Sequence, residues 1–481
     1  MKVLSPCRLL GIISGLVLVM QTLSGCDANK APPSGGTGTT QPQAESLTRP
    51  QIEAITQPQT ASGPEAPLGA RVRHLPLPGN ADYLLLDDFD QDGRPDLALT
   101  NHGANLSRLF LQRDSRQWQA GPVITAVGFH PGELLRIPGD LKPPRYLMLA
   151  EGDNVLRVMT ATEAGGLAPV AELGATAPRA GAWFHWPGWG TGLVFAPFTK
   201  SSMVLVKDFN STTAQAGDAL TLNYLPQFAK AEQVGVADLD GDGSDEILFT
   251  NSVTRSLMQI RYPGMDVQPA IETLWTFKPG GRSRFVFPVD LDQDGDLDLL
   301  VPDEIGLPDA KETNINVLIK EAAGGWESRL ISIPARPTSG KARTGIRGTA
   351  FGKDQDGQGY ILAAGYDLLT LVRIPPAWAG EKPEMRQIIL STKVALPAAE
   401  LKDLDGDGWL DAVLAGGMDE AHGGMIIYGP LWEGFAGLSG KDLEVPPAGD
   451  TAAVNSEEGS SMATASEKPT VTPPNPPEDG R

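Results

Sequence analysis

Four short stretches of the chain carry carboxylates at a fixed spacing that suits a calcium ion. Each stretch reads acid, any residue, acid, any residue, Asp, Gly, any residue, any residue, acid, and the four cover residues 88–96, 238–246, 290–298 and 403–411. Carboxylates at alternate positions of a tight loop converge on one point, where a hard divalent cation must neutralise them. Oxygen ligands of this number and flexibility suit calcium better than magnesium. We therefore predict about four bound Ca²⁺ ions, one for each stretch.

The sixth residue of each stretch is glycine, which adopts a sharp backbone reversal at low energetic cost. The seventh residue is expected to turn its backbone carbonyl toward the ion, so its side chain is free to vary. The alternative is that the stretches are acidic turns without metal, because Asp-Gly is also ordinary turn chemistry. The predicted metal-binding residues are Asp88, Asp90, Asp92, Arg94, Asp96, Asp238, Asp240, Asp242, Ser244, Glu246, Asp290, Asp292, Asp294, Asp296, Asp298, Asp403, Asp405, Asp407, Trp409 and Asp411.

The segments that follow the acids predict strands rather than helices. An EF-hand needs a bidentate glutamate at position twelve and a helix after it. Position twelve is instead Leu99, Phe249, Val301 or Leu414. In each stretch the last acid leads directly into a short apolar segment of strand length. The acidic loops therefore enter β-strands.

A repeat of roughly fifty residues organises the chain. The acidic stretches begin at separations of 150, 52 and 113 residues, close to three, one and two repeats. Weaker remnants at 137–149, 183–195 and 352–360 fill the gaps, and we expect the last of these to bind calcium weakly or not at all. Tryptophans mark the same period at separations of 157, 51, 52 and 54 residues, and they are Trp118, Trp275, Trp326, Trp378 and Trp432.

Each unit reads as short strands separated by turns, and four short strands in a repeat of this length are typical of a β-propeller blade. We therefore predict an all-β fold, a seven-bladed β-propeller over residues 70–440. Residues 71–77 look like the last strands of other units, whereas the final unit runs out of chain after Trp432. We expect residues 71–77 to supply the outer strand of the blade formed by residues 394–440, which leaves no sheet incomplete at the seam.

The acidic loops in their setting resemble FG-GAP and VCBS repeats, which occur in bacterial surface proteins and in the N-terminal propeller of integrin α subunits. The resemblance rests on residues 236–243 and 288–295, covers about residues 70–440 and is specific at four of the seven units. The Phe-Gly and Gly-Ala-Pro elements of the family are mostly absent, and Phe351-Gly352 is the nearest match. The resemblance implies that the cation loops join the innermost strand of a blade to the next strand, on the face opposite the usual ligand face.

The two ends of the chain read as segments outside the folded domain. Residues 1–25 combine basic residues with an apolar run at 9–20, as a secretory signal peptide does. The end of this segment resembles the lipobox of bacterial lipoproteins, which implies lipidation of Cys26 and attachment to the bacterial cell envelope, on the periplasmic side of the inner membrane or at the outer membrane. A soluble secreted protein or an uncleaved anchor is the alternative. The composition of residues 26–69 and 441–481 predicts a disordered tether and a disordered tail.

The composition restricts the class of partner. A formal charge of −20 argues against nucleic acid and anionic lipid, because both favour a basic surface. Cys7 is expected to leave with the signal peptide and Cys26 to be lipidated, so the mature chain would have no thiol left for a disulfide. Packing and bound cations must therefore stabilise the fold.

The predicted partner surface is the face opposite the cation loops. It is expected to carry residues 101–107, 251–255, 302–314 and 416–424, of which the long acidic loop 302–314 is the best candidate. A solvated variable loop is an equal alternative for that segment. Residues 183–189 contain three tryptophans that could form a platform for a sugar ring, although core packing is the favoured interpretation.

These observations predict a non-catalytic, calcium-stabilised, lipid-anchored and exported propeller that binds or scaffolds a protein or a glycan. No Gly-x-Ser-x-Gly, His-Glu-x-x-His or phosphate-binding glycine loop is present. The alternative is a calcium-dependent polysaccharide lyase or another glycan-active enzyme on a propeller fold. That alternative rests on His102 and His422, which fall on the predicted ligand face, because propeller lyases use calcium together with a histidine or a basic residue.

Overall fold

The structure is a computed structural model of the 481-residue chain, and it describes residues 71–443 apart from short internal stretches. The predicted signal peptide, Cys26, the predicted tether and nearly all of the predicted tail lie outside the described residues. The internal stretches that are not described are residues 211, 214, 216, 225–230, 232, 252, 265–266, 278–281, 284, 306–310, 335–344, 366–367, 376–377, 379–381, 391–395 and 417–421.

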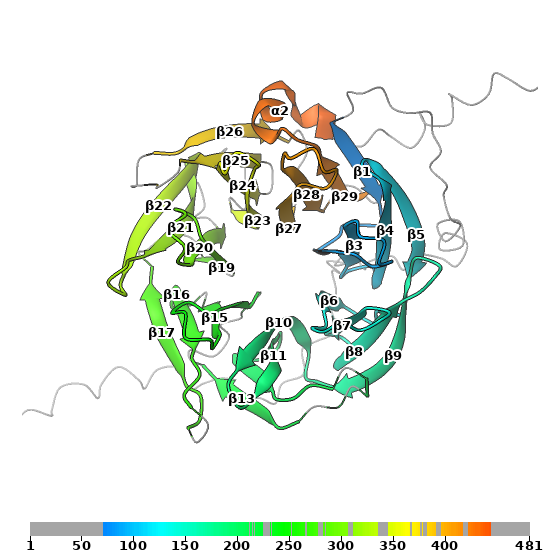
Figure 1. Ribbon diagram of the computed structural model, residues 1–481, viewed down its shortest axis with the longest axis vertical. Helices are drawn as coiled ribbons and strands as arrows, with labels where there is room; N and C mark the ends of the chain where they lie inside the picture. Colours follow the sequence, from blue (N-terminus) through cyan, green and yellow to red (C-terminus); the bar gives the residue numbers. More distant parts are fainter. Residues whose placement is uncertain are drawn as a thin grey trace, which may run out of the picture. The chain divides into compact units, whose positions relative to one another are not determined.

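Seven antiparallel β-sheets surround a central axis, and each sheet is one blade of a β-propeller (Figure 1). The prediction of an all-β, seven-bladed fold is therefore confirmed. We number the blades in chain order, beginning with the blade that contains the first acidic loop.

The strands of the first four blades follow one another along the chain. Blade 1 contains β2 (Tyr83–Asp87), β3 (Asp96–Asn101), β4 (Leu106–Asp114) and β5 (Gln117–Ile124). Blade 2 contains β6 (Pro131–Arg136), β7 (Arg145–Ala150), β8 (Val155–Ala161) and β9 (Leu167–Gly174). Blade 3 contains β10 (Pro178–Trp186), β11 (Gly190–Pro197), β12 (Ser202–Val206) and β13 (Ala219–Asn223). Blade 4 contains β14 (Gly235–Ala237), β15 (Glu246–Asn251), β16 (Ser256–Ile260) and β17 (Ile271–Thr276).

The last three blades complete the ring. In blade 5 the inner position is split between β18 (Arg282–Ser283) and β19 (Phe287–Val289), which both pair with β20 (Asp298–Ile305), and β21 (Glu312–Lys320) and β22 (Trp326–Pro334) follow. Blade 6 contains β23 (Ile346–Lys353), β24 (Gly359–Gly365), β25 (Leu368–Ile374) and β26 (Glu384–Ile389). Blade 7 contains β27 (Ala398–Lys402), β28 (Asp411–Ala415), β29 (His422–Ile427) and β1 (Val72–Pro76).

The second strands of most blades are buried along all or nearly all of their length because neighbouring blades cover both of their faces. All six residues of β15 are buried, and its centre reads Ile-Leu-Phe. The outermost strand β13 instead alternates between exposed and half-buried residues, the period of two expected for a strand with one solvated face. The core lies between blades, so Val413 and Ile426 of blade 7 share one hydrophobic cluster with Leu99 and Phe110 of blade 1.

The N-terminal strand closes the ring, as predicted. β1 pairs antiparallel with β29, with Val72 opposite Ile427. The Leu75 side chain is 2 % exposed and belongs to the cluster between blades 7 and 1. Across the same seam, Trp118 Nε1 donates a hydrogen bond of 2.8 Å to the Tyr428 hydroxyl. β1 therefore completes the sheet of blade 7 with a fourth strand.

A short helix follows β29, where the earlier blades run on into their outermost strands. The helix α2 (Leu431–Gly437) contains Trp432, whereas Trp118 and Trp275 lie in the outermost strands β5 and β17. A 3₁₀ helix, η1 (Gly440–Leu443), comes next, and Leu443 packs into the core. None of the helices in the described part of the chain is long and apolar enough to cross a membrane.

Candidate metal centres

All four acidic loops occupy the same position in their blades. Residues 88–96 join β2 to β3, 238–246 join β14 to β15, 290–298 join β19 to β20, and 403–411 join β27 to β28. Each loop thus connects the innermost strand to the second strand, as the family resemblance implied. Because the strands are antiparallel, all four loops lie at one end of the propeller. The connections between second and third strands lie at the other end.

A shared backbone pattern shapes these loops. The N–H of each seventh residue donates to Oδ1 of the fifth-position aspartate over 2.7–2.9 Å. The sixth-position glycines adopt φ angles of 86–97°, a conformation that other residues rarely adopt. A β-carbon at Gly93, Gly243 or Gly295 would meet no atom within 4 Å. The backbone conformation, and not a lack of space, therefore requires glycine there.

Three carboxylates gather in each loop, with their ligand atoms within 4.8 Å of one another. Three of the loops bring together the acids at the first, third and ninth positions, and the loop at 290–298 brings together the first, third and fifth. The fifth-position acids of all four loops, Asp294 included, accept the backbone N–H bond described above. The four groups are Asp88, Asp90 and Asp96; Asp238, Asp240 and Glu246; Asp290, Asp292 and Asp294; and Asp403, Asp405 and Asp411.

The ninth-position acid has a second role that the sequence did not reveal. Asp411 accepts one hydrogen bond from Leu404 N at 2.9 Å and another from Gly429 N, just beyond the third strand, at 2.7 Å. Asp96 and Asp298 accept the equivalent pairs of N–H groups in their own blades. All three side chains are fully buried. In these three blades the ninth-position acid therefore connects the loop to the third strand by hydrogen bonds.

Burial raises the pKa of these ninth-position carboxyls. Desolvation is the largest cause, and it brings the pKa of Asp96, Glu246 and Asp411 to about 7 and that of Asp298 to about 6. Nearby loop carboxylates raise these pKa values further, while backbone N–H donors lower them. A bound cation would favour the ionised form, so metal binding is expected to release protons near neutral pH.

The loop at 290–298 shows the clearest fit to calcium. Asp290 Oδ1 and Asp292 Oδ1 are buried and accept no hydrogen bond from the described residues. Burial raises the pKa of Asp292, and the charges of Asp294 and Asp290 raise it further. Buried carboxylate oxygens without a donor normally have a partner that is not part of the polypeptide. A set of carboxylate oxygens of like charge is suited to a calcium ion.

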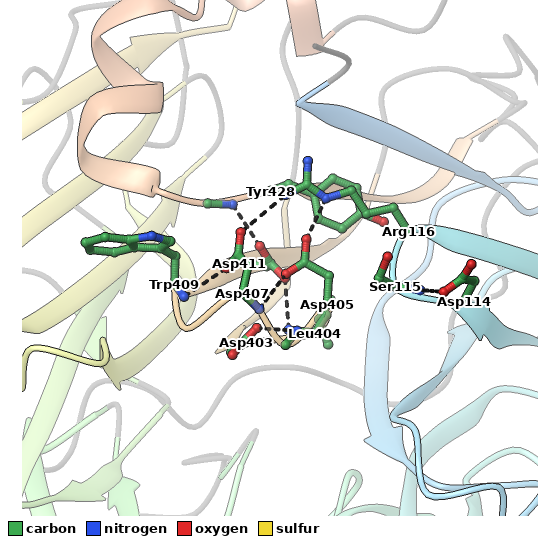
Figure 2. Close-up of polar contacts among 12 residues, drawn as sticks. Asp114, Ser115, Arg116, Asp403, Leu404, Asp405, Asp407, Trp409, Asp411 and Tyr428 are labelled. Carbon is green, nitrogen blue, oxygen red and sulfur yellow. Dashed lines mark hydrogen bonds and ion pairs between the residues drawn. The ribbon is translucent and has the colours of Figure 1, made fainter. Parts of the chain in front are cut away.

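Arginines outside the loops form close ion pairs of 2.5 Å with two of them. In Figure 2, Arg116 reaches the loop of blade 7 from the β4–β5 turn of blade 1, with its Nε 2.5 Å from Asp405 Oδ2. The Arg116 guanidinium also lies over the Tyr428 ring, 4.7 Å from its centroid. In blade 1, Arg113 Nη1 lies 2.5 Å from Asp90 Oδ2. Both arginines neutralise part of the negative charge of the acids.

Two of the seventh-position residues also use their side chains. The Arg94 guanidinium contacts Asp92 within the same loop. Asp296 Oδ1 lies 3.6 Å from Lys320 Nζ. The carbonyl ligation expected of all four seventh-position residues stays a prediction.

The degenerate loop between β23 and β24 keeps the turn and connects its neighbours. Its third-position acid, Asp354, accepts the N–H of Asp356 at 3.0 Å, as the third-position acids of blades 4 and 7 accept the N–H two residues later. Gln293 Nε2 of the blade 5 loop donates to Gly357 O at 2.9 Å. Gln355 N donates to Gly408 O of the blade 7 loop at 3.1 Å. The loops of blades 5, 6 and 7 are therefore joined through this segment.

The aromatic residues at 183–189 pack into the core, which confirms the favoured interpretation. Trp186 and Phe184 are fully buried, with ring centroids 4.8 Å apart. Trp189 packs partly buried against the same cluster. Trp186 Nε1 donates to Asp245 O at 2.7 Å and so links blade 3 to the acidic loop of blade 4.

The axis of the propeller holds a cavity of about 270 Å³ that the sequence did not predict. Residues on or beside the innermost strands of all seven blades line it, among them Asp82, Glu133, Arg179 and Glu400. Burial raises the pKa of Glu133 to about 8, although the Gly181 N–H and the charge of Arg179 lower it. No local sequence pattern predicts this cavity, because the residues that line it are spread along the chain from Asp82 to Glu400.

Of the two histidines singled out from the sequence, His102 lies between β3 and β4, and His422 is the first residue of β29 with its side chain outside the described part. The structure joins His102 to His130 and Glu151, whose ligand atoms lie within 4.8 Å of one another. The sequence analysis missed this group because its members come from three separate connections with no repeated spacing.

A comparison with protein-family models agrees with the repeat. Residues 238–301 match the family model described as FG-GAP-like repeat. No curated protein sequence matches the chain. Hydrazine synthase of Kuenenia stuttgartiensis is similar with a TM-score of 0.45 and 9% identity, covering 71% of this chain and 94% of its own.

Two further solved structures are similarly distant. Virginiamycin B lyase of Staphylococcus aureus gives a TM-score of 0.46 and 12% identity over 74% of this chain and 100% of its own. BBS1N in complex with ARL6DN gives a TM-score of 0.47 and 10% identity, and the match covers 74% of this chain and 94% of its own. At these scores no functional argument follows from any of the three.

The matched segment spans the acidic loops of blades 4 and 5 together with the strands between them. The same loop recurs at the same inner connection in blades 1 and 7. The chain is therefore a seven-bladed β-propeller that contains FG-GAP-like repeats.

Proposed function

We propose that this protein is a non-catalytic binding or scaffold module whose propeller is stabilised by calcium at its four acidic loops. The observation that carries the proposal is the convergence of three carboxylates at the same turn of four blades. The buried Oδ1 atoms of Asp290 and Asp292, which lack a donor among the described residues, add support. An all-oxygen donor set of this kind suits calcium rather than a softer metal.

Calcium would act on the loops by removing the repulsion between their acids. The first and third acids of each loop would supply ligands from one side, as Asp403 and Asp405 would in blade 7. The ninth acid, here Asp411, has more lone pairs than its two backbone hydrogen bonds use, so it can bind the ion and hold the third strand together. Binding to the folded state alone adds about 2.7 kcal/mol to stability at a hundredfold excess over the dissociation constant.

The end of the propeller opposite the loops is the proposed partner surface. The connections between second and third strands lie there, and the partner would be a protein or a glycan. Phe129, two residues before β6, and Val253, between β15 and β16, are both 53% exposed at this end. The favoured segment 302–314 is only partly described, since residues 306–310 lie outside the described part.

The proposal includes export and attachment to the cell envelope through a lipid on Cys26. Its support is the sequence of residues 1–26 alone. More than one acyl chain gives stable anchoring, which is the outcome expected of a lipidated N-terminal cysteine. Mass spectrometry of the membrane-extracted protein tests this directly: an acylated peptide beginning at Cys26 supports it, and an unmodified Cys26 in the extracted chain contradicts it.

Calorimetric titration of calcium into the chelator-treated full-length chain tests the calcium proposal, with thermal unfolding measured alongside. We expect about four sites and a large rise in melting temperature. Asp240→Asn should remove one site, whereas the matched variant Asp218→Asn, at an exposed residue outside the loops, should leave all of them. Absence of binding, or binding without stabilisation, would show that the loops are metal-free turns.

A glycan-active enzyme is the second candidate, and the axial cavity favours it. A carboxyl with a pKa of about 8, such as that of Glu133, carries a proton at neutral pH and can serve as a general acid. Burial also raises the pKa of Glu400, which lines the same cavity. The cavity would hold one small polar group rather than a long chain.

Release of reducing ends or of unsaturated sugars from a panel of neutral and anionic polysaccharides tests this candidate. Activity that disappears in Glu133→Gln and persists in Glu172→Gln, an outer-strand control, would establish an enzyme. Binding of a glycan without any release of product would favour the non-catalytic module.

A further inference from the structure

Three side chains at the end of the propeller opposite the acidic loops form a group with different ligand chemistry. His102, His130 and Glu151 each present a ligand atom, and these atoms lie within 4.8 Å of one another. The two imidazole rings have centroids 4.6 Å apart. Imidazole nitrogens suit zinc and related transition metals, whereas calcium prefers oxygen. This group is therefore distinct from the loops both in place and in chemistry.

Backbone hydrogen bonds hold His130 beside Glu151. Glu151 N donates to His130 O at 3.1 Å, and Gly152 N donates to Phe129 O at 2.9 Å. The approach is close: a β-carbon at Gly152 would lie 2.3 Å from a ring carbon of Phe129. His130 has a φ of 49° and its N–H donates to Asn105 Oδ1 at 2.7 Å. The two ligands are thus placed by the backbone itself.

His102 is oriented from two sides. Its Nδ1 lies 3.0 Å from Pro131 O, and its backbone N–H donates to Asp82 Oδ2 at 3.1 Å. A carbonyl oxygen can only accept, so Nδ1 carries the proton and Nε2 keeps its lone pair. Metal-binding histidines are commonly oriented in this way, through a ring N–H bound to a backbone carbonyl.

Glu151 completes the group from below the surface. Its side chain is 9% exposed, and Arg179 Nη1 lies 3.6 Å from its Oε2. A carboxylate has about four lone-pair sites on two oxygens, so one carboxylate can serve both a guanidinium and a metal. Asp82 and Arg179, which contact the group, also line the axial cavity.

We propose that His102, His130 and Glu151 bind one divalent transition-metal ion of the zinc class, at the edge of the axial cavity. Ligand atoms of a tetrahedral zinc site lie about 3.3 Å apart at metal–ligand distances near 2.0 Å, so small side-chain rotations complete the geometry. Three protein ligands leave a fourth position for water or an external ligand. The site does not depend on calcium in the loops.

Zinc titration of the full-length chain tests the proposal, with both cysteines replaced (Cys7→Ser, Cys26→Ser) and millimolar calcium present to saturate the carboxylate loops. We expect one zinc ion per chain. Cobalt at the same site should give the visible absorption of a four-coordinate ion with nitrogen ligands. His130→Asn keeps a residue that tolerates positive φ, and it should weaken zinc binding at least tenfold.

Glu151→Gln, a substitution of equal size, provides the second variant, and the unfolding temperature without metal shows whether each variant folds. His185→Asn, at an exposed histidine outside the group, is the matched control and should bind zinc as the parent does. The proposal is overturned if zinc does not bind in the presence of calcium. It is also overturned if folded His130→Asn and Glu151→Gln bind zinc like the parent, or if His185→Asn weakens binding equally.

Discussion

Arg116 Nε lies 2.5 Å from Asp405 Oδ2, although the two residues are 289 positions apart and belong to the first and last blades. The Asp405 side chain is 3% exposed and that of Arg116 is 42% exposed. This ion pair draws the acidic loop of blade 7 toward blade 1 at the seam that β1 closes. It also places a positive charge beside a proposed calcium site.

Replacing Arg116 by Gln should therefore have opposite effects on stability and on calcium affinity. Loss of a half-exposed ion pair should lower the free energy of unfolding in chelator by about 0.5 kcal/mol. Loss of a positive charge beside the loop should raise calcium affinity at one site several-fold. Calorimetry and thermal unfolding measure both quantities. Lys207→Gln, in blade 3, which has no acidic loop, is the control, and unchanged affinity in Arg116→Gln would contradict the prediction.

Asp292→Asn should stabilise the protein in chelator and destabilise it in saturating calcium. In chelator the substitution removes a carboxylate whose pKa is raised by burial and by Asp294 and Asp290, so the free energy of unfolding should rise. In saturating calcium it removes a ligand, and up to about 2.7 kcal/mol of binding stabilisation is lost at a hundredfold excess over the dissociation constant. Denaturant unfolding with and without calcium decides the matter. Equal losses in both conditions would argue against a metal site.

Glu133→Gln should flatten the dependence of stability on pH. The pKa of Glu133 is about 8 in the fold and near 4.5 when the group is exposed, so the folded state binds the extra proton between these values. Stability is therefore fully present below about pH 4.5 and falls as the pH rises toward 8. Since the side chain still reaches the cavity, we expect a loss on the order of 2 kcal/mol over this range, absent in Glu133→Gln.

Urea unfolding of the parent and of Glu133→Gln at a series of pH values from about 4.5 to about 8 tests this predicted pH dependence. The two proteins should have similar stability at the acid limit, and the variant should be the more stable at the alkaline limit. A parent stability that rises with pH relative to the variant would contradict a raised pKa.

Closure of the ring by β1 predicts a large effect of Leu75→Ala. Leu75 is 2% exposed and packs in the cluster shared by blades 7 and 1, so truncation should reduce the free energy of unfolding by about 2–5 kcal/mol. Leu330→Ala provides the matched control, because Leu330 in β22 is 55% exposed. Thermal unfolding of both variants is the measurement. Equal, small effects would mean that β1 contributes little to closure.

The features that the sequence predicted are local or periodic. The acids of each loop lie within nine consecutive residues, so their convergence follows from one turn and its glycine, as at Gly408 with a φ of 87°. Blade count and ring closure followed from the repeat, because each blade is a consecutive set of strands and only β1 is displaced. The structure confirmed the loop positions and the closing strand for this reason.

The features that only the tertiary structure decided join distant parts of the chain. Arg116 meets Asp405, Asp411 binds Gly429 N, and His102 meets Glu151 because neighbouring blades or strands bring them together. Side-chain contacts of this kind depend on how the blades pack around the axis, and a single sequence carries no spacing that reports it. The sequence by itself determined the repeated turns and the strands they join; the packing of the ring decided which side chains from different blades share a site.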